Sequence, residues 1–536
     1  MESSQLVSQC FSSEPKYTQI KAGLPEDYSS LKTIRDLLEI NYKLVGAKEQ
    51  LRQNLICILN KNGIKYPGII GYDQDVIPAL DRAILSCQDI FLIGQIGQAK
   101  TRLVEVIAKH LLSPIPVIEG SITNDTPMDL PQDVLVSLLD GQELSNSSPQ
   151  FHISPESAKK IQDHKLDTKI TWIDGSQRFR YVLATPDISV KDLVGYIDAI
   201  KVAKKGVEMY KIDSYSPGQL LQAKHGIFCI DELPVLDPRK QVALLSVLQE
   251  GRYTTGSYPV IFEPKTVFFA TANPIDYTHS GKIIEPLYDR LKSHIQTHYP
   301  KTIEDEMQII LQEAKTANCL IPIFVLKTLA RLVHNARVNS EINQAKGVSV
   351  RFGIHGLELL VGESERTRAI FHKKIPVPRL SDMYCLAQIA KFELSEIDDT
   401  IENRRKIFDL ILGNSIKETC LEYVHELTQA NFDSIKQEFS GKTFQVSQAM
   451  IWQNNQLSYS SQLTQFPKLS ELVHLKLEQI TLEQANLVDI VPNKNLITDQ
   501  ISKDELKAAI LEILLDAMYY TTPKIIDKKE TGYVSV

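Results

Sequence analysis

The feature that most constrains the fold of this chain is an eight-residue loop, GQIGQAKT, at Gly94–Thr101. The run DIFLI before it has the pattern of a buried strand, and the apolar residues of KTRLVEVIAKHLL recur on one face of a helix. Backbone N–H groups of a small-residue loop that enters a helix point at phosphate oxygens, and a lysine reaches the terminal phosphates. The pattern therefore predicts a phosphate-binding loop, with a coincidental glycine-containing turn as the alternative.

Within this loop we expect Lys100 to contact the phosphates of ATP and Thr101 to ligate Mg²⁺. The usual pattern has glycine where this chain has Ala99, and a β-carbon there is tolerable only if the backbone keeps a negative φ. The residues expected to bind the nucleotide are Gly94, Gln95, Ile96, Gly97, Gln98, Ala99, Lys100 and Thr101.

Two adjacent acids follow a second apolar run, GIFCIDEL at 226–233. Open α/β sheets bind ligands at the carboxyl ends of their strands, and buried carboxylates are costly unless they have partners. We expect Asp231 to hold Mg²⁺ through water and Glu232 to act as the general base on the attacking water. A strand that ends in an exposed acidic turn is the alternative.

Further polar residues complete the predicted site. TVFFATANP ends in Asn273, whose amide would orient the lytic water; an ordinary Asn-Pro turn is the alternative. An arginine from a neighbouring subunit often stabilises the transferring phosphoryl group. We expect Arg290 to act in trans and Arg351 to close a lid over the nucleotide, with Arg252 a weaker candidate for the trans role and a surface salt bridge the alternative for each.

The order of apolar runs predicts an α/β fold. Strands separated by helices imply a parallel sheet covered on both faces. After Pro300 the patterns are helical. A helix-like stretch covers roughly 28–60. We expect four parts: an N-terminal helical segment (1–65), an α/β nucleotide-binding domain (66–300), a helical subdomain (301–400) and a mostly helical C-terminal region (401–536). Five buried strands are expected in DIFLIG (89–94), IPVIEG (115–120), GIFCIDEL (226–233), TVFFATANP (266–274) and SHIQTHY (293–299).

Charge and cysteine content exclude some classes of protein. The net charge is -7 and the pI is near 6.0, which argues against the nucleic-acid backbone as the main partner. KVAKKG at 201–206 is a local basic run, for which a solvated helix end is the simpler interpretation. Seven cysteines without C-x-x-C spacing predict a reducing, cytoplasmic compartment. No window has the roughly 18 consecutive apolar residues of a membrane helix.

Taken together, these motifs resemble the helix-2-insert clade of AAA+ ATPases, and within it the ATPase subunit of magnesium chelatase and its MoxR-type relatives. In MoxR-type loops alanine commonly precedes the lysine, as Ala99 does here. The resemblance covers roughly residues 65–425, through GQIGQAKT, LATPDISVKDLVGYIDAIKVAKKG (183–206), SYSPGQLLQAKHGIFCIDELPVLDP (214–238), LLSVLQEGRYT (244–254), YDRL (288–291) and IPVPRLSDMY (375–384).

The resemblance implies an AAA+ P-loop domain with a five-stranded parallel sheet and a helical lid. It also implies a homo-oligomer, usually a hexameric ring with ATP between subunits, in which Arg290 matches the trans arginine finger and Arg351 the sensor-2 arginine. Residues 183–220 match an insert ahead of the acidic motif. A partner protein with a von Willebrand A domain is expected. This chain's own D-x-S-x-S start at Asp174 is broken by Arg178.

Two functions follow from the sequence. The first is an ATPase that couples Mg-ATP hydrolysis to remodelling of a partner protein, or to metal-cofactor insertion into it. The second is a nucleotide-controlled assembly or binding module with little hydrolysis. The complete set of loop, acids, asparagine and arginines favours the first. We expect neither a membrane nor nucleic acid as a partner.

Overall fold

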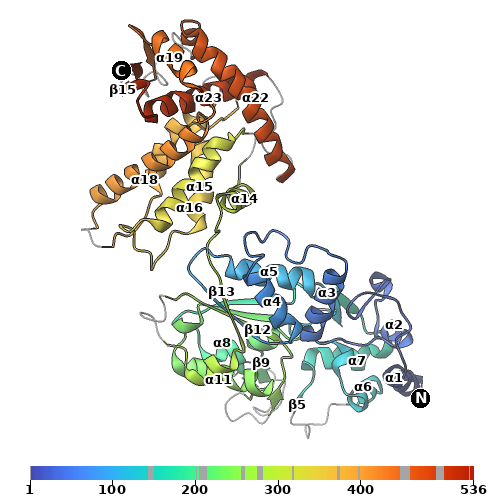
Figure 1. The fold of residues 1–536 in the computed structure, drawn as a ribbon. Coiled ribbons are helices and arrows are strands. Elements are labelled where there is room, and N and C mark those ends of the chain that lie inside the picture. The colour runs from blue at the N-terminus through green and yellow to red at the C-terminus, as the bar shows by residue number, and fades with distance from the viewer. Residues whose placement is uncertain are drawn as a thin grey trace. The chain divides into compact units, whose positions relative to one another are not determined.

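A computed structural model gives the architecture of the chain as two compact units, Met1–His298 and Tyr299–Val536 (Figure 1). The structure describes residues 2–142, 150–198, 200, 202–203, 214–254, 260–274, 282–316, 319–370, 375–395, 399–446, 459–490, 500–529 and 532–536.

A five-stranded sheet forms the centre of the first unit. All four strand pairings in it are parallel. This confirms the expected fold class. In spatial order the strands are β13 (Ser293–Gln296), β3 (Ile90–Ile93), β12 (Val267–Ala272), β10 (Ile227–Asp231) and β7 (Phe179–Leu183).

One of the five strands expected from the sequence is not in this sheet. Residues 115–120 do form a buried strand, β4 (Ile115–Ile118), but β4 pairs antiparallel with β6 (Ile170–Ile173) in a separate two-stranded sheet. The edge of the parallel sheet next to β10 is formed by β7. The prediction was wrong here because a short apolar run shows that a strand is buried without showing which strand it pairs with.

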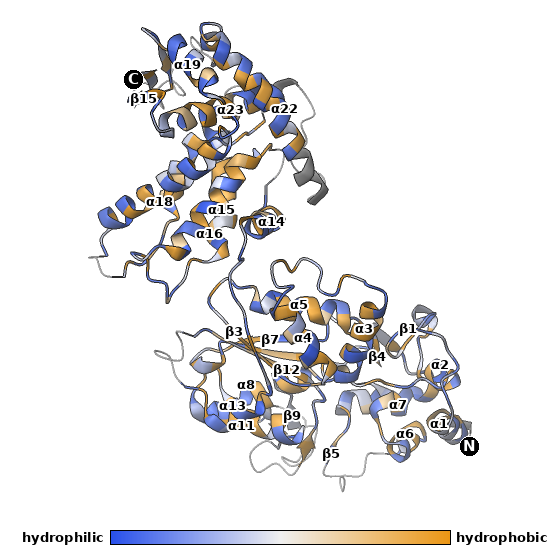
Figure 2. Cartoon of the chain, viewed as in Figure 1, coloured by the Kyte–Doolittle hydropathy of each residue, from blue (hydrophilic) through white to orange (hydrophobic). Residues whose placement is uncertain are grey.

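Helices cover both faces of the central sheet (Figure 1). Alternate residues of each strand point to opposite faces, so that Cys229 packs with one layer and Ile230 with the other. Figure 2 shows these strands as predominantly hydrophobic. One layer contains α3 (Ala47–Asn60), α4 (Val76–Leu85) and α5 (Lys100–Leu111). The other contains α8 (Val190–Val194), α10 (Gln219–Gln222), α11 (Pro238–Glu250) and α13 (Glu285–Arg290).

The N-terminal residues pack into a smaller core beside the sheet. The helix-like stretch expected at 28–60 is in fact two helices, α2 (Ile34–Glu39) and α3, because Asn41 takes a left-handed φ of 54° between them and Gly46 caps α3. The helices of the smaller core are α1 (Glu2–Ser12), α2, α6 (Gln132–Leu139) and α7 (Pro155–His164). Three further strand pairs are β1 (Gln19–Lys21) with β2 (Leu24–Pro25), β5 (Gln150–Phe151) with β11 (Ile261–Phe262), and β8 (Tyr196–Ile197) with β9 (Tyr215–Ser216).

The second unit is mostly helical around one hydrophobic core, as expected. A small antiparallel sheet in the order β14-β16-β15 was not expected. Within the described residues, no helix combines the length and apolar character needed to cross a membrane. The elements are α14 (Ile303–Glu313), α15 (Ile323–Val338), α16 (Val350–Ser364), α18 (Ile401–Glu422), α19 (Gln429–Glu438), β14 (Thr443–Gln445), α21 (Tyr459–Leu463), α22 (Pro467–Ile490), α23 (Gln500–Tyr520), β15 (Ile526–Lys529) and β16 (Gly532–Ser535).

Candidate functional site

The loop Gly94–Thr101 joins the carboxyl end of β3 to the start of α5, as the sequence predicts. The Gly94 N–H donates to the Ala272 carbonyl of β12 at 3.0 Å. A β-carbon at Gly94 would collide with the side chains of Thr297 and Gln98. The loop therefore needs glycine at its first position because neighbouring side chains close over the backbone.

The backbone conformation of Ala99 differs from the one expected from the sequence. Its φ is +51° and its ψ is 20°, in the left-handed region, so its backbone does not keep the negative φ that a β-carbon favours. Gly97 is also left-handed, with φ of +80°. A left-handed non-glycine residue costs about 1–2 kcal/mol, and such strain tends to persist at functional sites.

The loop is held by side chains that the sequence pattern did not single out. The Gln98 side chain is buried, and its Oε1 accepts hydrogen bonds from the Gln95 N–H at 3.0 Å and from Thr297 Oγ1 at 2.8 Å. The Tyr72 hydroxyl donates to the Gln98 carbonyl at 2.7 Å and to the His298 carbonyl at 3.1 Å. The Gln98 side chain thus stabilises the loop itself.

Lys100 begins α5, and its ammonium group lies against the loop. Its Nζ donates to the Gly94 carbonyl at 2.5 Å and to the Gln95 carbonyl at 3.0 Å. The side chain therefore folds back over the same turn whose backbone would surround a phosphate. A lysine at this position would supply a positive point charge to an anion bound at the turn.

The loop and the acidic motif meet directly. Thr101 Oγ1 donates to Asp231 Oδ2 at 3.2 Å, although the two residues are 130 positions apart in the chain. Asp231 is the last residue of β10, and the Thr271 hydroxyl of β12 donates to its Oδ1. A hydroxyl and a carboxylate in contact are the oxygen donors that Mg²⁺ prefers, so these residues fit the expected metal.

Glu232 follows Asp231 in a strained backbone conformation. Its φ is 56° and its ψ is 44°, which is left-handed, and its N–H donates to Thr271 Oγ1 at 3.1 Å. Asn273 follows β12 directly and is 7% exposed. The three residues Asp231, Glu232 and Asn273 therefore end two adjacent central strands, at the carboxyl edge of the sheet where the loop begins.

Tyr181 is a member of this site that the sequence did not predict. It lies on the edge strand β7, and its hydroxyl donates to Asp231 Oδ2 at 2.7 Å. Desolvation, together with this hydrogen bond, raises the pKa of the Tyr181 phenol. The phenol is therefore protonated at neutral pH and acts as a hydrogen-bond donor to the carboxylate.

The two arginines expected to act in catalysis lie in different units. Arg290 ends α13, with its side chain 33% exposed, and it donates to Gln249 Oε1 and to the Pro286 carbonyl, both at 3.2 Å. Arg351 is exposed in the first turn of α16, in the second unit. Arg252 is exposed and pairs with Glu250 at 3.2 Å. The roles of Arg290 and Arg351 stay predictions.

Two other sequence features have a clear outcome. Arg178, which breaks the D-x-S-x-S pattern, is fully buried, and its Nε donates to the His225 carbonyl at 2.9 Å. Its burial lowers its pKa to about 9.

The basic run 201–206 lies outside the described residues except for Val202 and Ala203. The same holds for the middle of the expected insert at 183–220.

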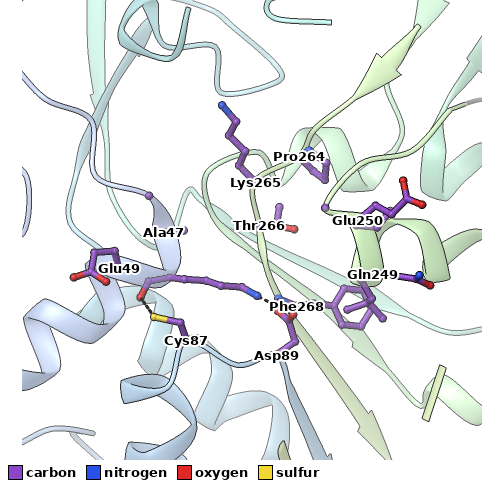
Figure 3. A pocket seen from close by; sticks show the side chains of 15 residues that line it. Ala47, Glu49, Cys87, Asp89, Gln249, Glu250, Pro264, Lys265, Thr266 and Phe268 are labelled. Carbon is purple, nitrogen blue, oxygen red and sulfur yellow. Dashed lines mark hydrogen bonds and ion pairs between the residues drawn. The ribbon is translucent and has the colours of Figure 1, made fainter. Parts of the chain in front are cut away.

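A separate pocket of about 630 Å³ lies at the amino ends of β3 and β12, at the opposite edge of the sheet from the loop. Lys48 lines this pocket, and its Nζ donates to Asp89 Oδ2 at 2.8 Å. Asp89 Oδ1 accepts from the Phe268 N–H at 2.9 Å, and Figure 3 shows Asp89 and Phe268 close together in the pocket wall. These contacts tie α3 to the start of two strands. The pocket is not part of the site at the loop.

The parallel sheet with its loop, acids and following helix defines a P-loop nucleoside-triphosphatase fold. A family model described as the PrkA AAA domain matches residues 78–345. This match covers half of the 536 residues, and the chain belongs to this AAA family. The expectation of an AAA+ protein is confirmed.

Curated relatives match over shorter stretches. An uncharacterized protein, YeaC of Bacillus subtilis strain 168, is 25% identical over 174 residues, which are 31% of this chain and 50% of that protein. An acetylglutamate kinase of Chlorobaculum parvum is 25% identical over 126 residues, which are 23% of this chain and 41% of the kinase. The chain thus spans half or less of the length of these relatives.

Several solved structures are similar over larger parts of the chain. A complex of the magnesium chelatase subunits BchI and BchD has 17% identity and a TM-score of 0.32, covering 63% of this chain and 98% of that one. A putative ATPase from Cytophaga hutchinsonii has 17% identity and a TM-score of 0.27, covering 68% and 95%. The Hsp104–ADP complex of S. cerevisiae has 13% identity and a TM-score of 0.34, covering 60% and 49%.

Proposed function

We propose that this chain binds Mg-ATP at Gly94–Thr101 and hydrolyses it. The observation that carries the proposal is the contact of Thr101 with Asp231, because it joins the phosphate loop to the acidic motif in one site. Lys100 supplies the positive charge and the loop supplies backbone N–H groups for the phosphates. When bound, Mg²⁺ would be held by Thr101 and Asp231 and would neutralise charge that develops on the phosphates.

The protein's own residues provide the remaining chemistry in this proposal. Glu232 accepts a proton from the attacking water, and Asn273 orients that water by hydrogen bonding. The strained backbone of Glu232 supports this role, since such strain concentrates at catalytic positions. Arg290 would stabilise the transferring phosphoryl group of a neighbouring subunit in a hexameric ring, and Arg351 would close over the nucleotide.

The hydrolysis would drive remodelling of a partner protein, or metal-cofactor insertion into it. The family match and the resemblance to MoxR-type and chelatase ATPases support this part of the proposal. A partner with a von Willebrand A domain fits that resemblance. Affinity capture with a Glu232→Gln variant, which should hold ATP-bound complexes together, tests for such a partner.

Phosphate release by the purified chain tests the hydrolysis directly. Wild type should turn over Mg-ATP, whereas Glu232→Gln should bind ATP with nearly unchanged affinity and lose at least about 100-fold in rate, because a positioned base contributes that much. Glu250→Gln is a matched control, since Glu250 is an exposed acid at the end of α11. Normal turnover by Glu232→Gln would refute the assignment of the base. ATP binding by wild type with no phosphate release would instead favour the assembly module.

A further inference from the structure

Tyr181 contacts Asp231 from an exposed position at the edge of the sheet. It belongs to the outermost strand of the sheet and is 42% exposed, yet its hydroxyl reaches Asp231 Oδ2 at 2.7 Å. In the strand register Tyr181 stands opposite Cys229, and Leu183 stands opposite Asp231. The phenol therefore extends toward the carboxyl end of the sheet to make this contact.

Tyr181 shares a sheet face with the rest of the site. Cys229 packs with α5, and alternate residues of a strand share one face, so Tyr181 and Asp231 both point to the α5 side. On β12, Phe269 packs on the same side, which places Thr271 there too. Three elements, β7, β12 and α5, thus each direct one hydroxyl at a single carboxylate.

The hydrogen bonds use most of the capacity of that carboxylate. An ionised carboxylate has about four acceptor positions. Oδ2 accepts from Tyr181 at 2.7 Å and from Thr101 at 3.2 Å, and Oδ1 accepts from Thr271. Donors on both oxygens prevent rotation of the group. Thr101 is itself an expected metal ligand, so Tyr181 and Thr271 are the two donors that do not depend on the ion.

We propose that Tyr181 is a positioning residue that fixes the Asp231 carboxylate for binding of Mg²⁺ with the nucleotide. This inference rests on the function proposed above. It assigns part of the affinity for the metal to an edge-strand tyrosine, which would act through its hydrogen bond to the Asp231 carboxylate. Groups that orient metal-binding side chains typically change metal affinity about 10- to 100-fold when they are removed.

The test is the Mg²⁺ dependence of binding of a fluorescent ATP analogue to the full chain. Tyr181→Phe keeps the ring and removes only the hydroxyl. We expect the Mg²⁺ concentration at half-saturation to rise about 10-fold. Analogue affinity in EDTA should stay within about twofold of wild type, and the thermal midpoint should not change, because the substitution removes only one hydroxyl from a residue that is 42% exposed. If Tyr181 had only a structural role, Tyr181→Phe would lower the thermal midpoint, or it would weaken analogue binding equally with Mg²⁺ and in EDTA.

Tyr196→Phe is the matched control, since Tyr196 is equally exposed at 42% and lies on β8 outside the site. It should leave the Mg²⁺ dependence unchanged. An unchanged Mg²⁺ half-saturation in Tyr181→Phe would overturn the inference while leaving the proposed function intact. If wild type itself binds no analogue, or binds it without regard to Mg²⁺, the proposed function fails and this inference fails with it.

Discussion

Within the loop Gly94–Thr101, Ala99 has a strained, left-handed backbone conformation. It sits at the position before Lys100 with a φ of +51°, a conformation that glycine adopts without cost. The neighbouring contacts of Gln98, Thr297 and Tyr72 hold the loop in this shape. The resemblance to MoxR-type loops anticipated an alanine, but the residue pattern alone gave the wrong sign for its φ.

Replacing Ala99 tests whether this strain is real. Ala99→Gly should raise the free energy of unfolding by up to about 1 kcal/mol, because relief of the left-handed β-carbon outweighs the added entropy of the unfolded chain. Ala99→Val should lower it, since a branched β-carbon is worse there. Urea unfolding of both variants measures the difference. A glycine variant less stable than wild type by more than 1 kcal/mol would contradict the strain.

Some of the residues around Asp231 could be predicted from the sequence and others could not. Asp231, Glu232 and Asn273 were predicted because they end apolar runs at strand ends. Thr271 could have been found from the alternation of side chains along β12, because it lies on the same face of the strand as Val267 and Phe269. Tyr181 was not found, because FRYVL is a short run on an edge strand and the pattern of longer apolar runs did not identify it as a strand.

At the scale of elements, a buried arginine joins three parts of the first unit. Arg178 precedes β7, and it donates to the Gln50 side chain of α3 at 2.9 Å and to the carbonyls of Ser113 and His225. It is fully buried. Its sequence context, after a broken metal motif, gave no indication of this role. Such a network fixes the start of the edge strand that presents Tyr181.

Loss of this side chain should weaken the whole unit. Arg178→Ala should lower the free energy of unfolding by about 3 kcal/mol or more, because it leaves buried carbonyls without donors and opens a cavity. Arg180→Ala is the matched control on the same strand, since Arg180 is partly exposed and makes one long hydrogen bond, to the Gln222 carbonyl at 3.5 Å. Chemical denaturation compares the two. Equal losses in both variants would show that Arg178 has no special role.

At the scale of the whole molecule, the residues expected from the sequence to act on the nucleotide do not all belong to one compact unit. The loop and the acids belong to the first unit, and Arg351 belongs to the second. The family match, residues 78–345, includes the boundary at His298. The sequence predicted the parallel sheet and the helical regions well because their periodicities are strong. It did not predict the β14-β16-β15 sheet, whose strands are only three or four residues long.

Assembly into a ring predicts that two inactive variants restore each other. Glu232→Gln removes the proposed base and Arg290→Ala removes the proposed trans arginine, so each variant alone should release little phosphate. Mixed rings contain interfaces in which the base comes from one variant and the arginine from the other, and these should regain part of the wild-type rate. The regained rate is measured as phosphate release over a series of mixing ratios of the two variants. In the control series, Arg252→Ala replaces Arg290→Ala in the mixture. Activity that never exceeds that of the separate variants would contradict action in trans.

The central claim is that Gly94–Thr101 binds the phosphates of ATP, and calorimetric titration of ATP into the purified chain tests it most directly. Wild type should bind one ATP per chain in the presence of Mg²⁺. Lys100→Met should weaken this binding by about 10- to 100-fold, because hydrogen bonds to a charged group contribute about 1.5–3 kcal/mol. Equal affinity of Lys100→Met and wild type, or no ATP binding by a folded wild-type chain, would contradict the account.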